Sequence, residues 1–203
     1  HGACPWSRVR ALKLMPVMAV SNSTLQKDEA VAPRFAAAGG KAPISAQTSL
    51  GYSGSVVSQV QLAPLRLDEA DGNSLDFSGM QFEASGDKQG KASTFHGQAD
   101  SLVIKRVQDD QPPATFELKG LKFGGNLAAT AHDAIYVGNV DLALAETKVT
   151  LGPKQQVLLI KGLEQKALQT LEGTDTVGGR AEYKVGDISW DGRAVGKAQM
   201  AVS

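Results

Sequence analysis

The chain has 203 residues, with 21 Lys and Arg against 21 Asp and Glu, and a pI near 7.0. This balance excludes the long-range positive field with which nucleic-acid-binding and anionic-membrane-binding proteins attract their partners. The longest apolar run, from Leu14 to Val20, is interrupted by Pro16 and is far shorter than the roughly 20 residues of a membrane-spanning helix. The single Cys4 excludes an internal disulfide and a cysteine-based metal site.

The composition indicates an all-β fold. The chain contains 22 Gly and 8 Pro, and 42% of its residues are hydrophobic, which is too apolar for disorder and too rich in Gly for a helical bundle. Thr, Val and Ser recur with a period of two, whereas apolar residues at helical spacing are scarce. We therefore predict a single domain over residues 1–203, built as a mainly antiparallel, extended and curved meander sheet with at most one or two short helices.

The predicted elements are strands separated by turns. The first strand is expected at residues 17–25, and a short helix or ordered loop at 30–40, which ends in two glycines. Residues 126–136 fit either a strand or one helical turn, and residues 163–171 fit either a strand or a short helix. Alternating patterns predict the remaining strands at 49–52, 56–67, 75–84, 92–107, 115–123, 140–151, 181–190 and 193–202.

Turn residues lie between these strands. Asp71-Gly72-Asn73 and residues 86–90 predict turns, and Asp109 to Pro113 are expected to end one strand before the next begins. Gly152-Pro153 breaks the alternation again. Asp191-Gly192 predicts a two-residue type I′ hairpin, because both central positions of that turn need a positive φ.

A weak internal repeat of about 40 residues runs through the chain. Each copy has apolar residues on alternate positions before a glycine, and after the glycine the alternation shifts by one residue. Such a shift is typical of a β-bulge with an inserted residue, which keeps the apolar side chains on one face. The copies are Leu75-x-Phe77-x-Gly79-Met80-x-Phe82, Phe116-x-Leu118-x-Gly120-Leu121-x-Phe123 and Leu158-x-Ile160-x-Gly162-Leu163, with glycines 41 and 42 residues apart.

The amino-acid sequence of several segments resembles that of the YdgA-like family of Gram-negative envelope proteins, a family without an assigned activity. The matching stretches are His1-Gly2 with Pro5, residues 14–19, 50–54, 62–65, 77–79 and 87–91, and Asp187-Ile188-Ser189-Trp190 with Gly192 and Val195-Gly196-Lys197. The resemblance implies a central periplasmic portion of a longer chain. An N-terminal inner-membrane anchor and a C-terminal part would then lie outside it. The resemblance supplies no active-site residues.

The residues that carry chemistry form no recognisable constellation. His1, His96 and His132 lack the spacing that would bring two imidazoles to one face of an element, and no Gly-x-Ser-x-Gly nucleophile turn is present. The acidic turn at 68–73 fails as a calcium loop, because the first ligand position of such a loop would be Leu67. We predict no catalytic, metal-binding or cofactor-binding residues, and we expect the protein not to be an enzyme.

Two functions remain open. The first is a non-enzymatic periplasmic scaffold that contacts another envelope protein, or a second copy, through the edges of its sheet. The second is binding of lipid or another apolar ligand along the concave face. They differ in whether the apolar set is covered by a second layer or left open. That set is Phe77, Phe82, Phe116, Leu118, Phe123, Leu158 and Ile160.

Overall fold

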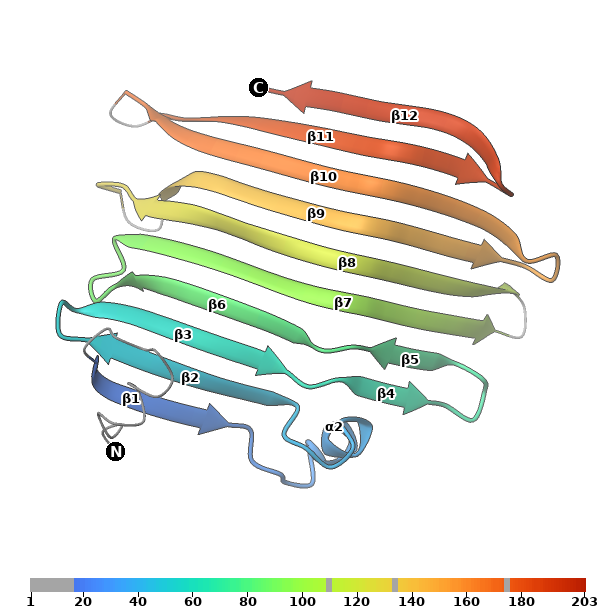
Figure 1. Cartoon of the computed structure of the whole chain (residues 1–203), viewed down its shortest axis with the longest axis horizontal. Helices are drawn as coiled ribbons and strands as arrows, with labels where there is room; N and C mark the ends of the chain where they lie inside the picture. The colour runs from blue at the N-terminus through green and yellow to red at the C-terminus, as the bar shows by residue number, and fades with distance from the viewer. Residues whose placement is uncertain (1–16, 109–110, 133–134, 174–175) are drawn as a thin grey trace, which may run out of the picture.

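The protein is one open antiparallel sheet with a single short helix beside it (Figure 1). The structure is a computed structural model that describes residues 17–108, 111–132, 135–173 and 176–203. Predictions about His1, Cys4 and Asp109-Asp110 fall outside these residues. The expected fold, an all-β antiparallel sheet with almost no helix, is confirmed.

The elements alternate between long strands and short turns. The helix α2 spans Ala32–Ala37, within the predicted helix or loop, and begins with a proline at its second residue, where a missing N–H costs nothing. The strands are β1 Val17–Thr24, β2 Ile44–Gly51, β3 Ser55–Leu62, β4 Leu65–Asp68, β5 Ser74–Phe77, β6 Met80–Asp87, β7 Ala92–Gln108, β8 Gln111–Ala129, β9 Tyr136–Leu151, β10 Gln156–Glu172, β11 Thr176–Trp190 and β12 Arg193–Val202.

The sheet is a meander in which strands adjacent in sequence are also adjacent in space. Its order is β1-β2-β3-β6-β7-β8-β9-β10-β11-β12, while β4 pairs with β5 and β5 also pairs with β7. Strands β3 and β4 therefore lie along one broken line, and β6 and β5 along the next (Figure 1). Hairpin connections of this kind keep every described pairing antiparallel.

Two strands predicted as continuous are each divided. The predicted strand 56–67 ends at Leu62 and resumes at Leu65, and 75–84 is interrupted at Ser78-Gly79. Pro64 has no N–H to give to the neighbouring strand. Gly79, which faces this break, has a φ of +92°, and a Cβ placed on it would lie 2.7 Å from the carbonyl oxygen of Leu62. The close approach of the two backbones explains why both strands break at the same level.

The other differences are in strand length and type. Strand β8 begins at Gln111, so Pro112 and Pro113 lie inside it rather than in a turn before it. They lie beyond the level of Leu151, where the antiparallel strand β9 ends and its pairing with β8 stops. Strand β8 continues through Ala129, and residues 163–171 belong to β10 and form no helix. The Asp191-Gly192 hairpin is confirmed, with φ values of 46° and 76°.

The three repeat glycines lie where the sheet changes phase. Gly79, Gly120 and Gly162 have φ values of +92°, +66° and +64°, a conformation that glycine adopts without steric cost. Pairing stops at Gly120 and resumes with unchanged register, Lys119 opposite Glu146 and Leu121 opposite Leu144. The inserted residue expected from the sequence is therefore absent. Strands β7 to β11 shift phase at the same level, so none of them has a residue more than its neighbour there. Only β11 and β12 change register at this level, between Val185 and Ile188 and between Ile188 and Ser189.

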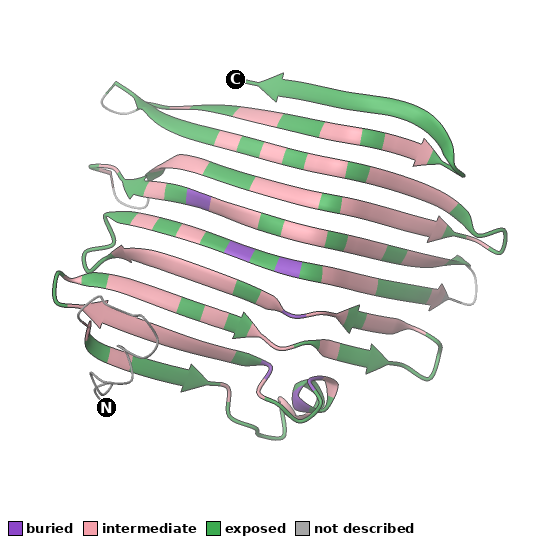
Figure 2. Cartoon of the chain, viewed as in Figure 1, coloured by how far each residue is buried: buried purple, intermediate pink, exposed green. Residues whose placement is uncertain are grey.

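Very little of the described chain is fully buried. The buried hydrophobic residues are Phe35, Ala38 and Ala99, and no side chain of any kind falls below 2% exposure. Figure 2 shows most of the sheet as intermediate or exposed. A single layer of sheet has no partner against which to form an interior, so its apolar side chains are half-buried only by one another.

Candidate functional site

The candidate site is one face of the sheet, here called the apolar face, on which apolar residues of successive strands stand in register. On one side of the glycine positions, Ala99, Leu121, Leu144, Leu163 and Val185 are paired from strand to strand across β7 to β11. On the other side, Leu65, Phe77, Leu102 and Leu118 are paired across β4, β5, β7 and β8. Because the alternation shifts between the two sets, both lie on the same face.

Three phenylalanines form the centre of the apolar face. Phe82 on β6 and Phe123 on β8 flank Gly97 on β7, and their rings are stacked with centroids 6.0 Å apart. Phe95 on β7 is 6.5 Å from Phe82 in a tilted arrangement. Gly97 and Gly125 have no side chain, and the rings of Phe123 and Phe95 occupy the space above them. The sequence did not single out Phe95 or these two glycines, because only the register reveals that they are opposite the phenylalanines.

The structure brings the predicted apolar set together in three register rows. Phe77, Leu118 and Ile160 share one row, Phe116 and Leu158 share the next, and Phe82 and Phe123 lie in a third row beyond the glycine positions. Sequence reasoning missed members contributed by β7, β9 and β11. The alternation of β7 and β9 was visible, but it gave no means of telling which strand would lie beside which. These further members are Leu102, Ile104, Leu144, Val149 and Val185.

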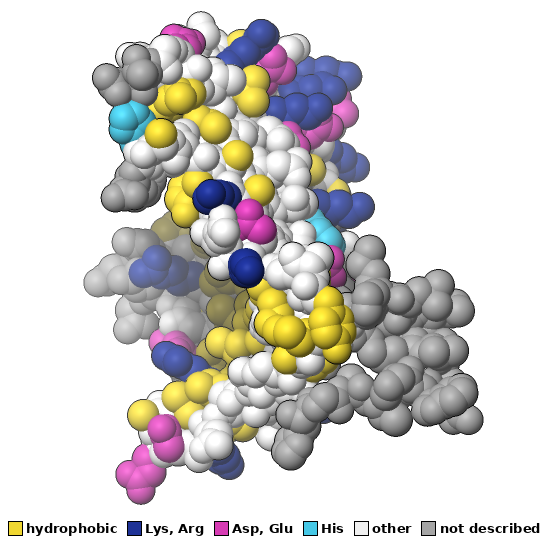
Figure 3. All heavy atoms as spheres, turned by 90° about the vertical axis from the view of Figure 1, so that its left-hand side faces the viewer, with side chains coloured by type: hydrophobic (Ala, Val, Ile, Leu, Met, Phe, Trp, Pro, Cys, Tyr) yellow, Lys and Arg dark blue, Asp and Glu magenta, His cyan; other side chains and the backbone are white. Residues whose placement is uncertain are grey.

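No second layer covers the apolar face within the part of the chain that the structure describes. Of the predicted members, Phe116 is 41% exposed and the others are half-buried. Ile104, a further member of the face, is 37% exposed. Figure 3 shows hydrophobic side chains running down the end of the sheet, with Lys, Arg, Asp and Glu gathered along one edge of that view in its upper half. The sheet therefore has one apolar and one charged side.

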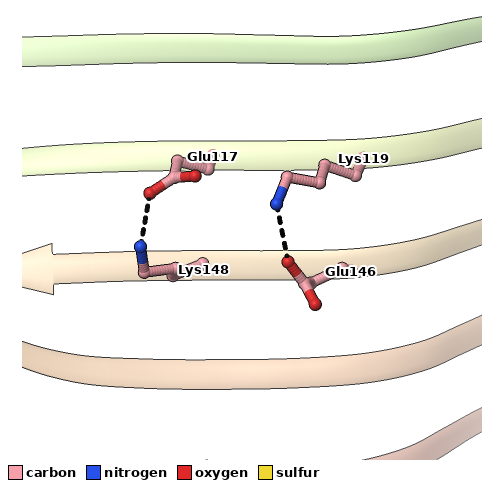
Figure 4. Close-up of polar contacts among 4 residues, drawn as sticks. All are labelled: Glu117, Lys119, Glu146 and Lys148. Atoms are coloured by element: carbon pink, nitrogen blue, oxygen red, sulfur yellow. Dashed lines mark hydrogen bonds and ion pairs between the residues drawn. The ribbon is translucent and has the colours of Figure 1, made fainter.

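The opposite face carries cross-strand ion pairs. Lys119 Nζ is 3.0 Å from Glu146 Oε1, and Lys148 Nζ is 2.7 Å from Glu117 Oε1, both between β8 and β9 (Figure 4). Directly opposite unlike charges stabilise antiparallel strands. The charges continue to alternate in sign along the same register position, from Glu146 on β9 to Lys161 on β10 and Asp187 on β11.

These contacts shift two pKa values. The hydrogen bond from Lys119 lowers the pKa of Glu146; the positive charges of Lys119, Lys161 and Lys148 lower it further, and partial burial opposes them. The same hydrogen bond raises the pKa of Lys119. Both groups are consequently charged at neutral pH, and the face is held together by mutual neutralisation.

The hollows of the described surface are open, and polar and apolar residues line them together. One of about 450 Å³ crosses β3, β6, β7 and β8, and Gln59, Gln81, Glu83 and His96 are among its lining residues. No Ser, Thr or Cys lines this hollow. A second hollow of about 410 Å³ contains Ser45 and Ser78 but no histidine. Neither of these two hollows combines a hydroxyl or thiol nucleophile with an imidazole.

No cluster of three or more His, Cys, Asp or Glu side chains able to hold a metal ion occurs in the described ranges. Within those ranges, no helix has the length and hydropathy to cross a bilayer. His96 and His132 lie on different elements, in β7 and in the turn after β8.

An open sheet with one uncovered apolar face and one ion-paired face defines a β-sheet module that presents surfaces rather than an enclosed pocket. The chain belongs to the DUF945 family of bacterial proteins of unknown function, whose model matches residues 1–203. It is 28% identical over 203 residues to Protein YdgA of Escherichia coli (strain K12). The match covers 100% of this chain and 40% of that protein, so the chain spans about two-fifths of its relative's length. No solved structure is significantly similar.

Proposed function

We propose that this chain is a non-enzymatic binding module whose apolar face holds the acyl chains of lipids. The observation that carries this proposal is the exposure of aligned apolar side chains that no described residue covers. An exposed apolar surface that crosses many strands is unfavourable in water, and large patches of this kind mark binding surfaces. Between the two functions left open by the sequence, an uncovered face favours the apolar ligand.

The chemistry of the face suits a ligand without polar groups. Its central rows consist mainly of Leu, Val, Ile, Phe and Ala; Gly97, Gly125 and Thr147 also belong to them, and no charged residue is among the members paired across β7 to β9. An acyl chain needs no hydrogen-bonding partner, and each methylene removed from water contributes about 0.8 kcal/mol. A protein interface, by contrast, has a polar rim and about ten direct hydrogen bonds. Because such binding depends on the apolar area removed from water and not on specific polar contacts, we expect the face to accept acyl chains of different lengths.

The cellular placement belongs to the same proposal. The resemblance to YdgA-like envelope proteins supports a periplasmic module, tethered to the inner membrane in the full-length protein. In that setting, acyl chains are abundant and the apolar face has a ligand within reach. The chain corresponds to 40% of YdgA, so the support for a periplasmic placement comes from the family resemblance and not from the whole length of that relative.

The experiment that tests the proposal is native mass spectrometry of the full-length protein extracted from its own envelope. We expect lipid at a defined stoichiometry. Photo-cross-linking with a palmitate analogue carrying a diazirine should then label peptides that contain Phe82, Phe116 or Phe123. A protein that is free of lipid and is not labelled by the probe would overturn the proposal.

A matched pair of variants separates the two faces of the sheet. Phe116 and Thr115 are neighbours on β8 and point to opposite faces, and Phe116 is 41% exposed. We expect Phe116→Gln to reduce labelling by the palmitate probe several-fold and Thr115→Gln to leave it unchanged. Equal labelling of both variants would contradict binding on the apolar face.

The scaffold function is our second proposal, and the feature that favours it is strand β12. Among the described strands, β12 pairs with β11, and all ten of its residues are exposed. A strand with one unpaired side offers its backbone N–H and C=O groups to a partner. Under this proposal, a lipid-free protein in a discrete complex would be recovered from the envelope.

A further inference from the structure

The face of the sheet opposite the apolar face changes character between its two halves. From β8 to β11 it carries the alternating charges described above. Amide side chains predominate on it across β3, β6 and β7, which lie side by side in Figure 1. Residues two positions apart on a strand share a face, so two neighbouring register rows stand together here. One row contains Gln61, Gln81, Gln98 and, on β8, Lys122, and the other contains Gln59, Glu83 and His96.

These two rows line a single hollow, here called the amide hollow. It is the hollow of about 450 Å³ described above, and the residues of both rows line it together with Val60, Phe82, Gly97 and Phe123. Those four residues form the register row between the two polar rows, and that row belongs to the apolar face. The floor of the amide hollow is therefore backbone, and its walls are polar side chains. Small-molecule sites usually measure about 300–1,000 Å³.

Most polar side chains of the amide hollow have no partner within the described chain. Gln59 Nε2 donates a hydrogen bond of 2.8 Å to Glu83 Oε2, which positions that carboxylate. On the same face, the next pair along β7 and β8 is also bonded, with Thr94 Oγ1 2.9 Å from Asn126 Oδ1. The side chains that make no hydrogen bond or ion pair with any described residue are those of Gln61, Gln81, His96, Gln98 and Lys122. Donors and acceptors that a ligand can use are thus gathered in this hollow.

The groups of the amide hollow suit a ligand that both donates and accepts hydrogen bonds. A Gln amide donates through its NH₂ and accepts through its carbonyl oxygen, and a neutral imidazole also does both. The charged lining residues are Glu83 and Lys122, whose formal charges cancel and give no preference for an anion or a cation. An acyl chain would leave the amides it covers without partners, which costs free energy. The hydroxyl and acetamido groups of a sugar instead offer each amide a donor and an acceptor.

We propose that the amide hollow binds an uncharged oligosaccharide of N-acetylated amino sugars. Gln81 and Gln98 lie directly opposite each other on β6 and β7, and they bind the acetamido group of one ring. Glu83, positioned by Gln59, accepts a hydrogen bond from a sugar hydroxyl. This inference goes beyond acyl-chain binding and does not depend on it, because the hollow lies on the other face of the sheet.

The test uses the full-length protein, so that a hollow filled by another part of the chain gives no binding and counts against the proposal. The probe is a linear tetrasaccharide of N-acetylglucosamine with fluorescein at its reducing end. In fluorescence anisotropy we expect saturable binding with a dissociation constant below about 1 mM. The tetrasaccharide of glucosamine has the same rings with ammonium groups in place of the acetamido groups, and it should bind about fivefold or more weakly. Absence of binding, or equal binding of the two sugars, would overturn the proposal.

Matched variants assign the binding to the amide hollow. Gln81→Leu and Gln98→Leu each remove an exposed amide and should weaken binding about fivefold. Gln199→Leu makes the same change in the register row of Gln98, but on β12 and outside the hollow, and should leave binding unchanged. Unchanged affinity in both hollow variants, or an equal loss in Gln199→Leu, would contradict this site. Labelling by the palmitate probe reports on the apolar face alone, so either proposal can fail without the other.

Discussion

Phe123 on β8 lies directly opposite Gly97 on β7, and its ring occupies the space that a Cβ on Gly97 would need. Two residues along, the relationship is reversed. Phe95 on β7 lies opposite Gly125 on β8, and the Cζ of Phe95 is 3.0 Å from the position of a Cβ there. Each ring thus covers a glycine on the neighbouring strand, which protects the exposed backbone and gives the aromatic centre of the apolar face its stacking.

Gly97→Ala is expected to lower the free energy of unfolding by about 1–2 kcal/mol, because the new methyl group displaces Phe123 from its contact with Phe82. Denaturant unfolding followed by circular dichroism measures the loss. Gly179→Ala is the matched control, since the nearest atom to a Cβ on that strand glycine is 3.5 Å away. In a Phe123→Leu background the cost of Gly97→Ala should shrink. An undiminished cost there would show that the ring is not the obstacle.

Gly120→Ala should destabilise more than Gly162→Ala. Both glycines have a positive φ, +66° and +64°, so both substitutions carry the same backbone strain, of about 1 kcal/mol. A Cβ on Gly120 would also lie 2.8 Å from the Cβ of Ala145, whereas the nearest atom at Gly162 is 3.7 Å away. Thermal unfolding of the two variants measures the difference. Equal losses would contradict the crowding at Gly120.

Glu146→Gln tests the ion-paired face through its pH dependence. A carboxylate whose pKa is lowered in the folded protein stabilises it above the usual value of 4.5 and loses that contribution as pH falls through the folded value. We therefore expect Glu146→Gln to cost about 0.5 kcal/mol near pH 7 and progressively less as the pH falls below the usual value of 4.5. Urea titrations across this range provide the measurement. Glu69→Gln, in the exposed turn between β4 and β5, is the control and should cost less near pH 7 than Glu146→Gln.

Asp191→Ala should weaken the final hairpin, whereas Asp191→Asn should be tolerated. Asp191 has a φ of 46°, and its Oδ1 accepts a hydrogen bond of 2.8 Å from the backbone N–H of Val157. Asn keeps an acceptor and tolerates this conformation, while Ala does neither. We expect a loss of about 1–2 kcal/mol for Ala. Faster amide exchange in β11 and β12 of the Ala variant would accompany it, and unchanged exchange in both variants would refute the anchoring role.

The local features of this protein follow directly from its sequence. Period-two alternation identifies the strands because side chains of a strand point alternately to its two faces. Asp191-Gly192 predicts its turn because both positions need a positive φ, and the repeat glycines mark the places where the alternation shifts. The apolar set from Phe77 to Ile160 was visible in the same way, as residues of one face. Each of these signals depends on a few neighbouring residues.

The relationships between strands were decided by the tertiary structure. The sequence pattern suggested an inserted residue at Gly120, but the register shows that β8 and β9 shift together. The Phe-over-Gly pairs, the alternating charges from Lys119 to Asp187 and the exposure of the apolar face within the described chain all depend on which residue lies opposite which. Alternation is a property of a single strand, whereas register and coverage arise from contacts between distant segments, and no local pattern specifies those contacts.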